Sequence, residues 1–186
     1  MSESSSPLLT LEPLLEAVQD GIERAGWTLS GLQKTTSLQF EGRWEGESTR
    51  SAYLFFHRDG LPDCVSLDVF LDETSKGLEG NFALVIDGPD LGELGSMEEL
   101  LEALAAVSKK ALPAGYGTPV SVRLRLPEVS TEPAEADSEF RLKLRIPKRA
   151  YEAGAGAVSA LASASVTAFE AALRHPELRP FLTDHD

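Results

Sequence analysis

The strongest constraint on the fold is a set of six short strand-like runs, most of which alternate apolar and polar side chains. A period of two residues is that of a β-strand with one buried face. The runs span residues 37–44, 51–58, 64–72, 81–87, 121–127 and 140–147. Turn segments rich in Gly, Pro and Asp separate the first four runs, which predicts an antiparallel meander.

Three segments instead have the apolar spacing of amphipathic or buried helices: residues 10–26, 96–112 and 151–174. Strands that follow one another between single helices are typical of an α+β domain. We therefore predict one α+β domain over residues 10–175, with a mostly antiparallel sheet, flanking helices and the order α-ββββ-α-ββ-α. Residues 1–9 are expected to be a disordered N-terminal segment, and residues 176–186 a C-terminal tail.

Charge and hydropathy limit the possible partners. The net charge is -13 over 186 residues, which repels nucleic acid and anionic membrane over most of the surface. The N-terminus lacks the basic and apolar regions of a signal peptide. Serines and Glu170 interrupt the most apolar segment, residues 157–173. With a single cysteine, the sequence predicts a soluble cytoplasmic protein with neither nucleic acid nor membrane as its partner.

Residues with catalytic or metal-binding potential form no recognisable motif. His57, His175 and His185 lack the spacing of metal ligands, and Cys64 has no neighbouring base. The acidic segment 87–93 matches turn chemistry better than a cation site. No nucleophile elbow, P-loop or dinucleotide fingerprint occurs. We therefore expect no catalytic residue, no metal and no cofactor, and favour a protein that is not an enzyme.

The last two strand runs, SVRLRLP and FRLKLRIP, gather cations on one face of a predicted hairpin. These cations are Arg123, Arg125, Arg141, Lys143 and Arg145. Like charges that face each other across strands are unfavourable, so acidic groups should offset them. Three sources remain open: the acidic segment 127–139 that joins the runs, neighbouring strands through Asp68, Asp72 or Glu41, or a binding partner.

Aromatic side chains mark a second candidate surface. Tyr53, Phe55 and Phe70 fall on the strand face opposite Leu54 and Phe56. An uncovered sheet would expose them, and clustered exposed aromatics are typical of contact surfaces. A helix that covers this face is an equally good interpretation. The last helix is rich in Gly, Ala and Ser, which favours close packing on the rest of the chain or on a second copy.

The hypothesis that follows is a non-catalytic binding protein that engages a protein partner, or a second copy of itself as a homodimer, through its sheet. The hairpin cations and the aromatics named above would make the contact. The order of elements loosely resembles that of small acidic secretion-chaperone domains, with a longer first run of strands; that resemblance implies dimerisation and binding of another protein. The alternative is a small-molecule site or an enzyme, with a pocket between sheet and helices where arginines bind an anion.

Overall fold

The computed structural model describes residues 9–36, 50–74, 76–88, 94–111, 120–125 and 137–182. These residues form the predicted single α+β domain, with one antiparallel sheet in the order β1-β2-β3-β4-β6-β5. The strands are β1 (Thr28–Thr36), β2 (Arg50–His57), β3 (Val65–Thr74), β4 (Gly77–Asp87), β5 (Val120–Arg125) and β6 (Asp137–Arg145). The helices are α1 (Leu11–Arg24), α2 (Leu94–Ala111), α3 (Lys148–Ala153) and α4 (Ala155–Leu173), followed by the short 3-10 helix η3 (Arg179–Phe181).

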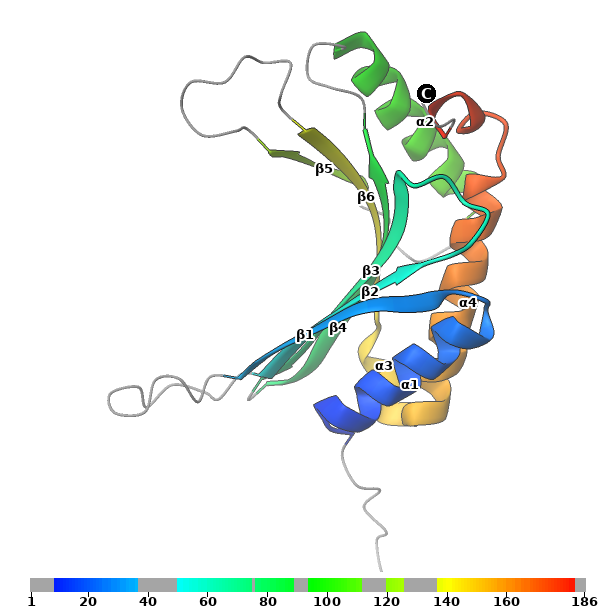
Figure 1. Cartoon of the computed structure of the whole chain (residues 1–186). Coiled ribbons are helices and arrows are strands. Elements are labelled where there is room, and N and C mark those ends of the chain that lie inside the picture. Colours follow the sequence, from blue (N-terminus) through cyan, green and yellow to red (C-terminus); the bar gives the residue numbers. More distant parts are fainter. Residues whose placement is uncertain are drawn as a thin grey trace, which may run out of the picture.

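The sheet is strongly curved, and the helices lie on its convex side (Figure 1). Its concave side faces left in that view, and no described helix covers it. The alternation predicted from the sequence explains this arrangement, because each strand sends its apolar side chains to the helices. Leu54, Leu67, Leu84 and Leu142, one from each of the four central strands, are all at most 1% exposed within this core.

The first strand differs from the prediction. Strand β1 spans Thr28–Thr36, a segment for which no element was predicted from the sequence, whereas the predicted strand at residues 37–44 lies outside the described residues. The alternation in β1 is weak for two physical reasons. It is an edge strand, and the register shifts between Leu29 and Gly31, so the side-chain pattern changes phase within the strand.

Helix α1 ends at Arg24, and Gly26 follows it with a left-handed φ of 92°. The backbone N–H groups of Gly26 and Trp27 donate to the carbonyls of Glu23 and Ile22, the double closure of a Schellman motif. At the start of the helix, Thr10 occupies the N-cap position. The Thr10 hydroxyl makes no capping hydrogen bond, and the Leu11 N–H donates to the Glu73 carboxylate at 3.0 Å.

Small residues bring α1 and α4 into close contact. A Cβ added at Gly21 would lie 2.2 Å from the carbonyl oxygen of Ser159 and 3.0 Å from the Cβ of Ala162. The Ser159 hydroxyl accepts a hydrogen bond from Arg24 at 2.9 Å and donates one to Asp20 at 3.2 Å. The small-residue helix therefore packs within the chain, which was one of the two interpretations of its composition.

The predicted last helix is two helices, because Gly154 interrupts it with a φ of 95°. Beyond α4, the chain continues to pack on the domain. Leu178 is fully buried, and Lys110 on α2 donates to the Glu177 carboxylate at 2.8 Å. That hydrogen bond lowers the pKa of Glu177 below its ordinary value.

Tyr151 on α3 carries a buried hydroxyl that has no hydrogen-bond partner among the described residues. Burial, and then the charge of Glu79, raise the pKa of this phenol well above its ordinary value, against a smaller opposing effect of Arg145. The raised pKa means that the unfolded chain loses the phenolic proton first. Any stability that depends on this group is therefore fully present below about pH 10 and lost as the pH rises further.

Tyr151→Phe is accordingly expected to raise the free energy of unfolding at pH 7 by about 1 kcal/mol, because it removes an unpaired buried polar group without loss of ring packing. The same variant should lose less stability than the wild type between pH 9 and pH 11. Urea unfolding at these pH values measures both effects. A loss of stability at pH 7 would mean that the hydroxyl has a partner that the structure does not record.

Candidate functional site: the concave sheet face

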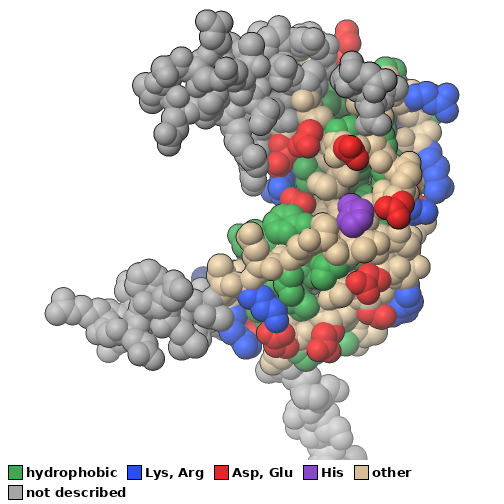
Figure 2. Space-filling view, in the orientation of Figure 1, with side chains coloured by type: hydrophobic (Ala, Val, Ile, Leu, Met, Phe, Trp, Pro, Cys, Tyr) green, Lys and Arg blue, Asp and Glu red, His purple; other side chains and the backbone are tan. Residues whose placement is uncertain are grey.

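The candidate site is the concave face of the sheet, defined as the side chains that point away from the helices. Strand register places the aromatic and charged residues named from the sequence on this one face. The described lining residues of its central hollow are Gln33, Tyr53, Phe55, Ser66, Asp68, Val69, Phe70, Asn81, Val85, Asp87, Glu139 and Arg141. The hollow has a volume of about 470 Å³. Figure 2 shows this hollowed side, where apolar and acidic side chains lie next to each other.

One end of the hollow is aromatic. Tyr53 on β2 and Phe70 on β3 are direct register partners, and their ring centroids are 4.8 Å apart at an interplanar angle of 41°. Phe55 lies beside β1, where Gly31 leaves room for its ring: a Cβ on Gly31 would meet Phe55 Cδ2 at 3.2 Å. The Tyr53 side chain is 41% exposed. An aromatic cluster of this kind offers a large apolar contact area at low entropic cost.

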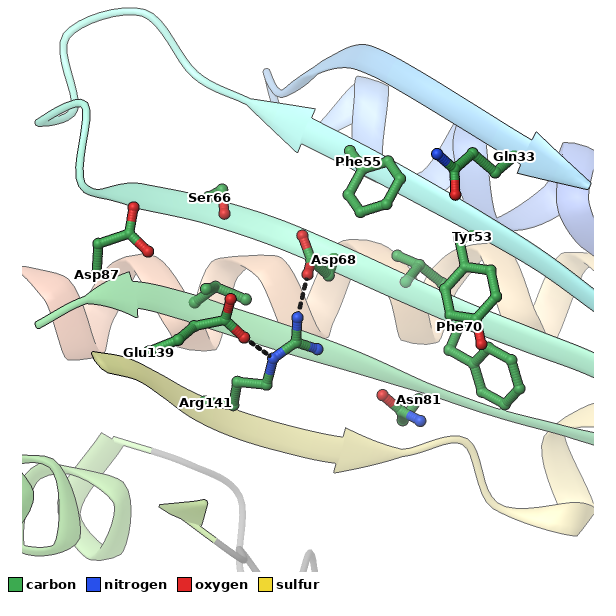
Figure 3. A pocket seen from close by; sticks show the side chains of 12 residues that line it. Gln33, Tyr53, Phe55, Ser66, Asp68, Phe70, Asn81, Asp87, Glu139 and Arg141 are labelled. Atoms are coloured by element: carbon green, nitrogen blue, oxygen red, sulfur yellow. Dashed lines mark hydrogen bonds and ion pairs between the residues drawn. The ribbon is translucent and has the colours of Figure 1, made fainter. Parts of the chain in front are cut away.

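The other end holds a partly buried ion-pair cluster around Arg141 on β6 (Figure 3). The Arg141 guanidinium donates to Asp68 on β3 at 2.6 Å and, through Nε, to Glu139 on its own strand. All three side chains are only 15–16% exposed. Charge-assisted hydrogen bonds in such a site are stronger than those at the surface. Arg141 therefore holds two carboxylates in place at the centre of the sheet.

Small side chains form the floor between these two ends. Ala83 lies in the row between those of Phe70 and Arg141, and Ser66 and Val85 lie in the same row as Arg141. Ala83 and Val85 are 1% and 4% exposed although they face the concave side, because taller neighbours surround them. The hollow thus forms because the side chains at these positions of β3 and β4 are small. The strands remain paired beneath it.

The three hairpin cations with described side chains, Arg141, Lys143 and Arg145, occupy the concave face but have different surroundings. Arg141 is engaged by its carboxylates, whereas Arg145 lies 4.0 Å from Glu79 with 79% of its side chain exposed. Lys143 makes no ion pair within the described part of the chain. Arg123 and Arg125 are the register partners of Glu139 and Asp137, and their side chains lie outside the described residues.

The β5–β6 register does not place the cations of the two strands directly opposite each other, although the sequence had suggested this. Arg123 faces Glu139 and Arg141 faces Ser121, so no two of these cations are direct partners across the hairpin. Two of the three sources of acidic groups considered contribute to Arg141: a neighbouring strand provides Asp68, and the last residue of the acidic segment 127–139 provides Glu139. Residues 127–136 of that segment, and Glu41, lie outside the described residues.

Sequence reasoning missed several polar residues of the site. Gln33 belongs to the strand that was not predicted, and Asn81 was treated only as the start of a strand. Glu139 was assigned to the linking segment, but it lies in β6 and contacts Arg141. A signal for Glu139 was present, because it alternates in phase with Arg141 and Lys143. The residues predicted for the aromatic cluster, Tyr53 and Phe70, do come together.

The described residues contain no group of three or more His, Cys, Asp or Glu side chains that could hold a metal ion. His57 is exposed at the end of β2, and Cys64 is partly buried just before β3. The face combines an apolar anchor, hydrogen-bonding groups and charges, which is the composition of a recognition surface.

Comparison with known proteins places the chain in no group. No protein-family model, no curated protein and no solved structure matches it. Function must therefore be inferred from the side chains of the site itself.

Helix α4 is long and apolar enough to cross a membrane, with a mean hydropathy of 1.4. However, 44% of that stretch is buried in the domain, against α1 and the sheet. A core helix of a soluble protein has the same properties, so this helix is consistent with a soluble chain.

Arg141→Ala is expected to lower the free energy of unfolding by about 2 kcal/mol, because it leaves the carboxylates of Asp68 and Glu139 close together in a partly buried site. The loss should stay below that of a fully buried pair, since both carboxylates make further interactions. Urea unfolding of Arg141→Ala measures the loss, and Arg145→Ala provides the control. Because the pair of Arg145 is long and exposed, its removal should cost less than about 0.5 kcal/mol. Equal losses would contradict a structural role specific to Arg141.

Proposed function

We propose that this chain is a non-catalytic binding protein that engages a protein partner through the concave sheet face. The observation that carries the proposal is the one-sided covering of the sheet. Helices lie along the convex side, while the opposite side presents Tyr53 and Phe70 above a hollow. Monomeric soluble proteins rarely leave clustered aromatics open to water without a binding role. The cytoplasmic location inferred from the sequence belongs to the same proposal.

The anionic-ligand alternative has weaker support. It requires an arginine that is free to bind a carboxylate or phosphate inside the hollow. Arg141 is the described arginine that lines the hollow, and its Nε and one terminal nitrogen already donate to Glu139 and Asp68. An incoming anion would also meet those two carboxylates at close range, which is unfavourable. The volume of about 470 Å³ fits a small molecule or two to three side chains of a protein equally well.

Affinity capture from the native cell lysate tests the proposal with a pair of matched variants. Tyr53 and Leu32 are both 41% exposed, but Leu32 is the register partner of Leu54 and therefore lies on the helix side of the sheet. Tyr53→Ala is expected to reduce recovery of a stoichiometric partner at least tenfold, whereas Leu32→Ala should leave recovery unchanged. Truncation of a central aromatic anchor typically has an effect of this size.

Three results would contradict the proposal: equal recovery by all forms, loss in Leu32→Ala but not in Tyr53→Ala, or no stoichiometric partner. Light scattering of the purified protein identifies the case in which the partner is a second copy. A dimer of the wild type that dissociates in Tyr53→Ala would support the concave face as a homodimer interface, and a dimer that persists would place its interface elsewhere.

A further inference from the structure

The chemistry of the partner can be inferred from one row of side chains that crosses the concave face. Strand register aligns Gln33, Tyr53, Phe70, Asn81 and Arg145, one from each of β1, β2, β3, β4 and β6. The row is perpendicular to the strands. Neighbouring strand backbones lie about 4.8 Å apart, so the row extends over roughly 19 Å from β1 to β6. By the same spacing, the backbone of Arg145 lies about 10 Å from that of Phe70. This inference rests on the proposed function, because it concerns the occupant of the same face.

Two amides border the aromatic pair. Gln33 lies beside Tyr53, and Asn81 lies beside Phe70 (Figure 3). Neither amide makes a side-chain hydrogen bond within the described part of the chain. Each offers both a donor and an acceptor, the complement of a peptide group. A polypeptide that crosses the strands could therefore pack a side chain on the rings and pair its backbone with the amides.

The cations next to this row are not neutralised in the way that Arg141 is. Lys143 is partly exposed and makes no ion pair within the described residues, and Arg145 has only a long contact with Glu79. Lys143 and Arg145 lie on the same face of β6, two positions apart, directly beyond Ala83 and Asn81. The aromatic pair thus has Lys143 and Arg145 on its β6 side, while Asp72 and Glu79 lie in the next row, on the side away from Arg141. The Arg141 end is balanced by its own carboxylates.

We propose that the partner presents a short linear peptide in which an apolar side chain is followed or preceded, two or three residues away, by Asp or Glu. The apolar side chain packs on Tyr53 and Phe70, and the carboxylate binds Lys143 and Arg145. The spacing follows from the distance of about 10 Å between the two subsites and a rise of about 3.3 Å per extended residue.

The overall charge of -13 does not prevent recognition of an acidic group. At physiological ionic strength, charges are screened beyond about 8 Å, so the nearest cations determine the local preference. The remote acidic surface instead slows the approach of strongly acidic chains. This balance favours a peptide with one or two acidic residues beside an apolar anchor over a highly acidic tail.

Selection from a phage-displayed library of random 12-residue peptides tests the inference with four immobilised forms of the full chain. These are the wild type, Lys143→Glu/Arg145→Glu, Tyr53→Ala/Phe70→Ala, and the control Lys109→Glu/Lys148→Glu. The control makes the same change in net charge at exposed positions of α2 and α3. Circular dichroism confirms that each form is folded before selection.

The wild type and the control are expected to enrich peptides with an apolar residue two or three positions from Asp or Glu. The charge-reversed form should enrich Lys or Arg at that spacing instead, and the aromatic double variant should lose enrichment. Fluorescence anisotropy with the most enriched peptide should give at least tenfold weaker binding to the charge-reversed form and unchanged binding to the control.

The inference is overturned if the wild type enriches no peptide, if the enriched peptides lack acidic residues, or if charge reversal leaves the selected peptides unchanged. The selected peptides also show whether only the acidic subsite or the whole concave face is rejected. Peptides without an acidic residue that still require Tyr53 and Phe70 would retain the concave face and reject only the acidic subsite. Peptides that bind all four forms equally would reject both.

Discussion

Gly21→Val is expected to lower the free energy of unfolding by about 3 kcal/mol, an effect at the upper end of those seen for overpacked cores. The side chain would begin with a Cβ 2.2 Å from the backbone oxygen of Ser159, and a backbone atom within a helix cannot move away alone. Helices α1 and α4 would have to separate, which would loosen the apolar layer that supports the sheet. Urea or thermal unfolding followed by circular dichroism measures the loss.

Gly156→Ala provides the matched control for that variant. Gly156 lies in the first turns of α4, is exposed, and has open space around the position of an added Cβ. Alanine there should raise the free energy of unfolding by about 0.5–1 kcal/mol, because it reduces the entropy of the unfolded chain and favours helix. If Gly21→Val were as stable as the wild type, α1 and α4 could not be packed as closely as described.

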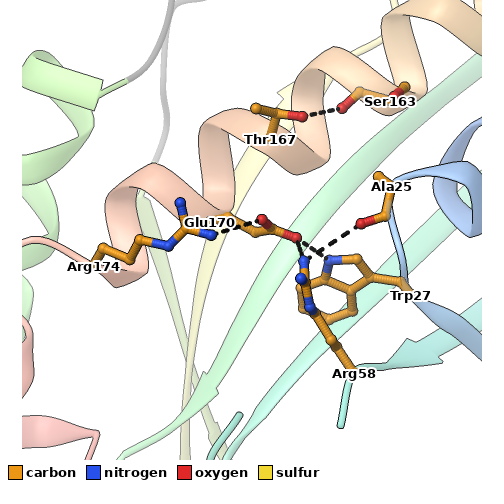
Figure 4. A network of polar contacts seen from close by, with 7 residues as sticks. All are labelled: Ala25, Trp27, Arg58, Ser163, Thr167, Glu170 and Arg174. Carbon is orange, nitrogen blue, oxygen red and sulfur yellow. Dashed lines mark hydrogen bonds and ion pairs between the residues drawn. The ribbon is translucent and has the colours of Figure 1, made fainter. Parts of the chain in front are cut away.

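The second large effect is expected at Glu170 on α4, which binds three donors at the edge of the core (Figure 4). Its carboxylate accepts the indole N–H of Trp27 at 3.0 Å, forms an ion pair with Arg58, and contacts Arg174 at 3.3 Å. Glu170 is 13% exposed and Trp27 is 2% exposed. This cluster ties α4 to the turn after α1 and to the end of β2.

Glu170→Ala should therefore lower the free energy of unfolding by about 3 kcal/mol, since it leaves a buried indole N–H and a partly buried guanidinium unpaired. Glu170→Gln retains an acceptor for Trp27 and should lose about half as much. Guanidinium unfolding monitored by tryptophan fluorescence in a Trp44→Phe background, where Trp27 is the remaining tryptophan, reports both stability and the environment of the indole. Glu152→Ala, in an exposed pair with Lys148, should change stability by less than about 0.5 kcal/mol; a similar loss in both would contradict the account.

Much of the fold could be predicted because its strands are buried on one face only. In β2, β3 and β6 alternate positions are buried as predicted. Strand β4 buries the predicted Phe82, Leu84 and Ile86, and also Ala83 and Val85 on the concave side. Strand β1 could not be predicted, since an edge strand with a bulge buries few of its side chains. The interruption at Gly154 was also missed, because glycine is tolerated within a helix and its φ depends on how α3 and α4 pack.

The candidate site was partly accessible from the sequence. Alternation alone placed Tyr53, Phe55 and Phe70 on the same face as the hairpin cations. What alternation cannot provide is strand order and register, which decide whether a cation meets a carboxylate. Arg141 reaches Asp68 across β4, a contact between residues 73 positions apart. Strand order and register also distinguish the cations from one another. Arg141 is paired with carboxylates of the protein, whereas Lys143 and Arg145 lie on the side of the face toward the aromatic pair.

The central claim is that the concave face contacts a protein partner, and site-specific photocrosslinking tests it most directly. A benzophenone-bearing amino acid placed at position 53 or at position 32 would be irradiated in the native cells, followed by mass spectrometry of covalent adducts. We predict a discrete adduct from the position of Tyr53 and none from that of Leu32, which has the same exposure on the opposite side of the sheet. Adducts from position 32 alone, or from neither position, would contradict the account.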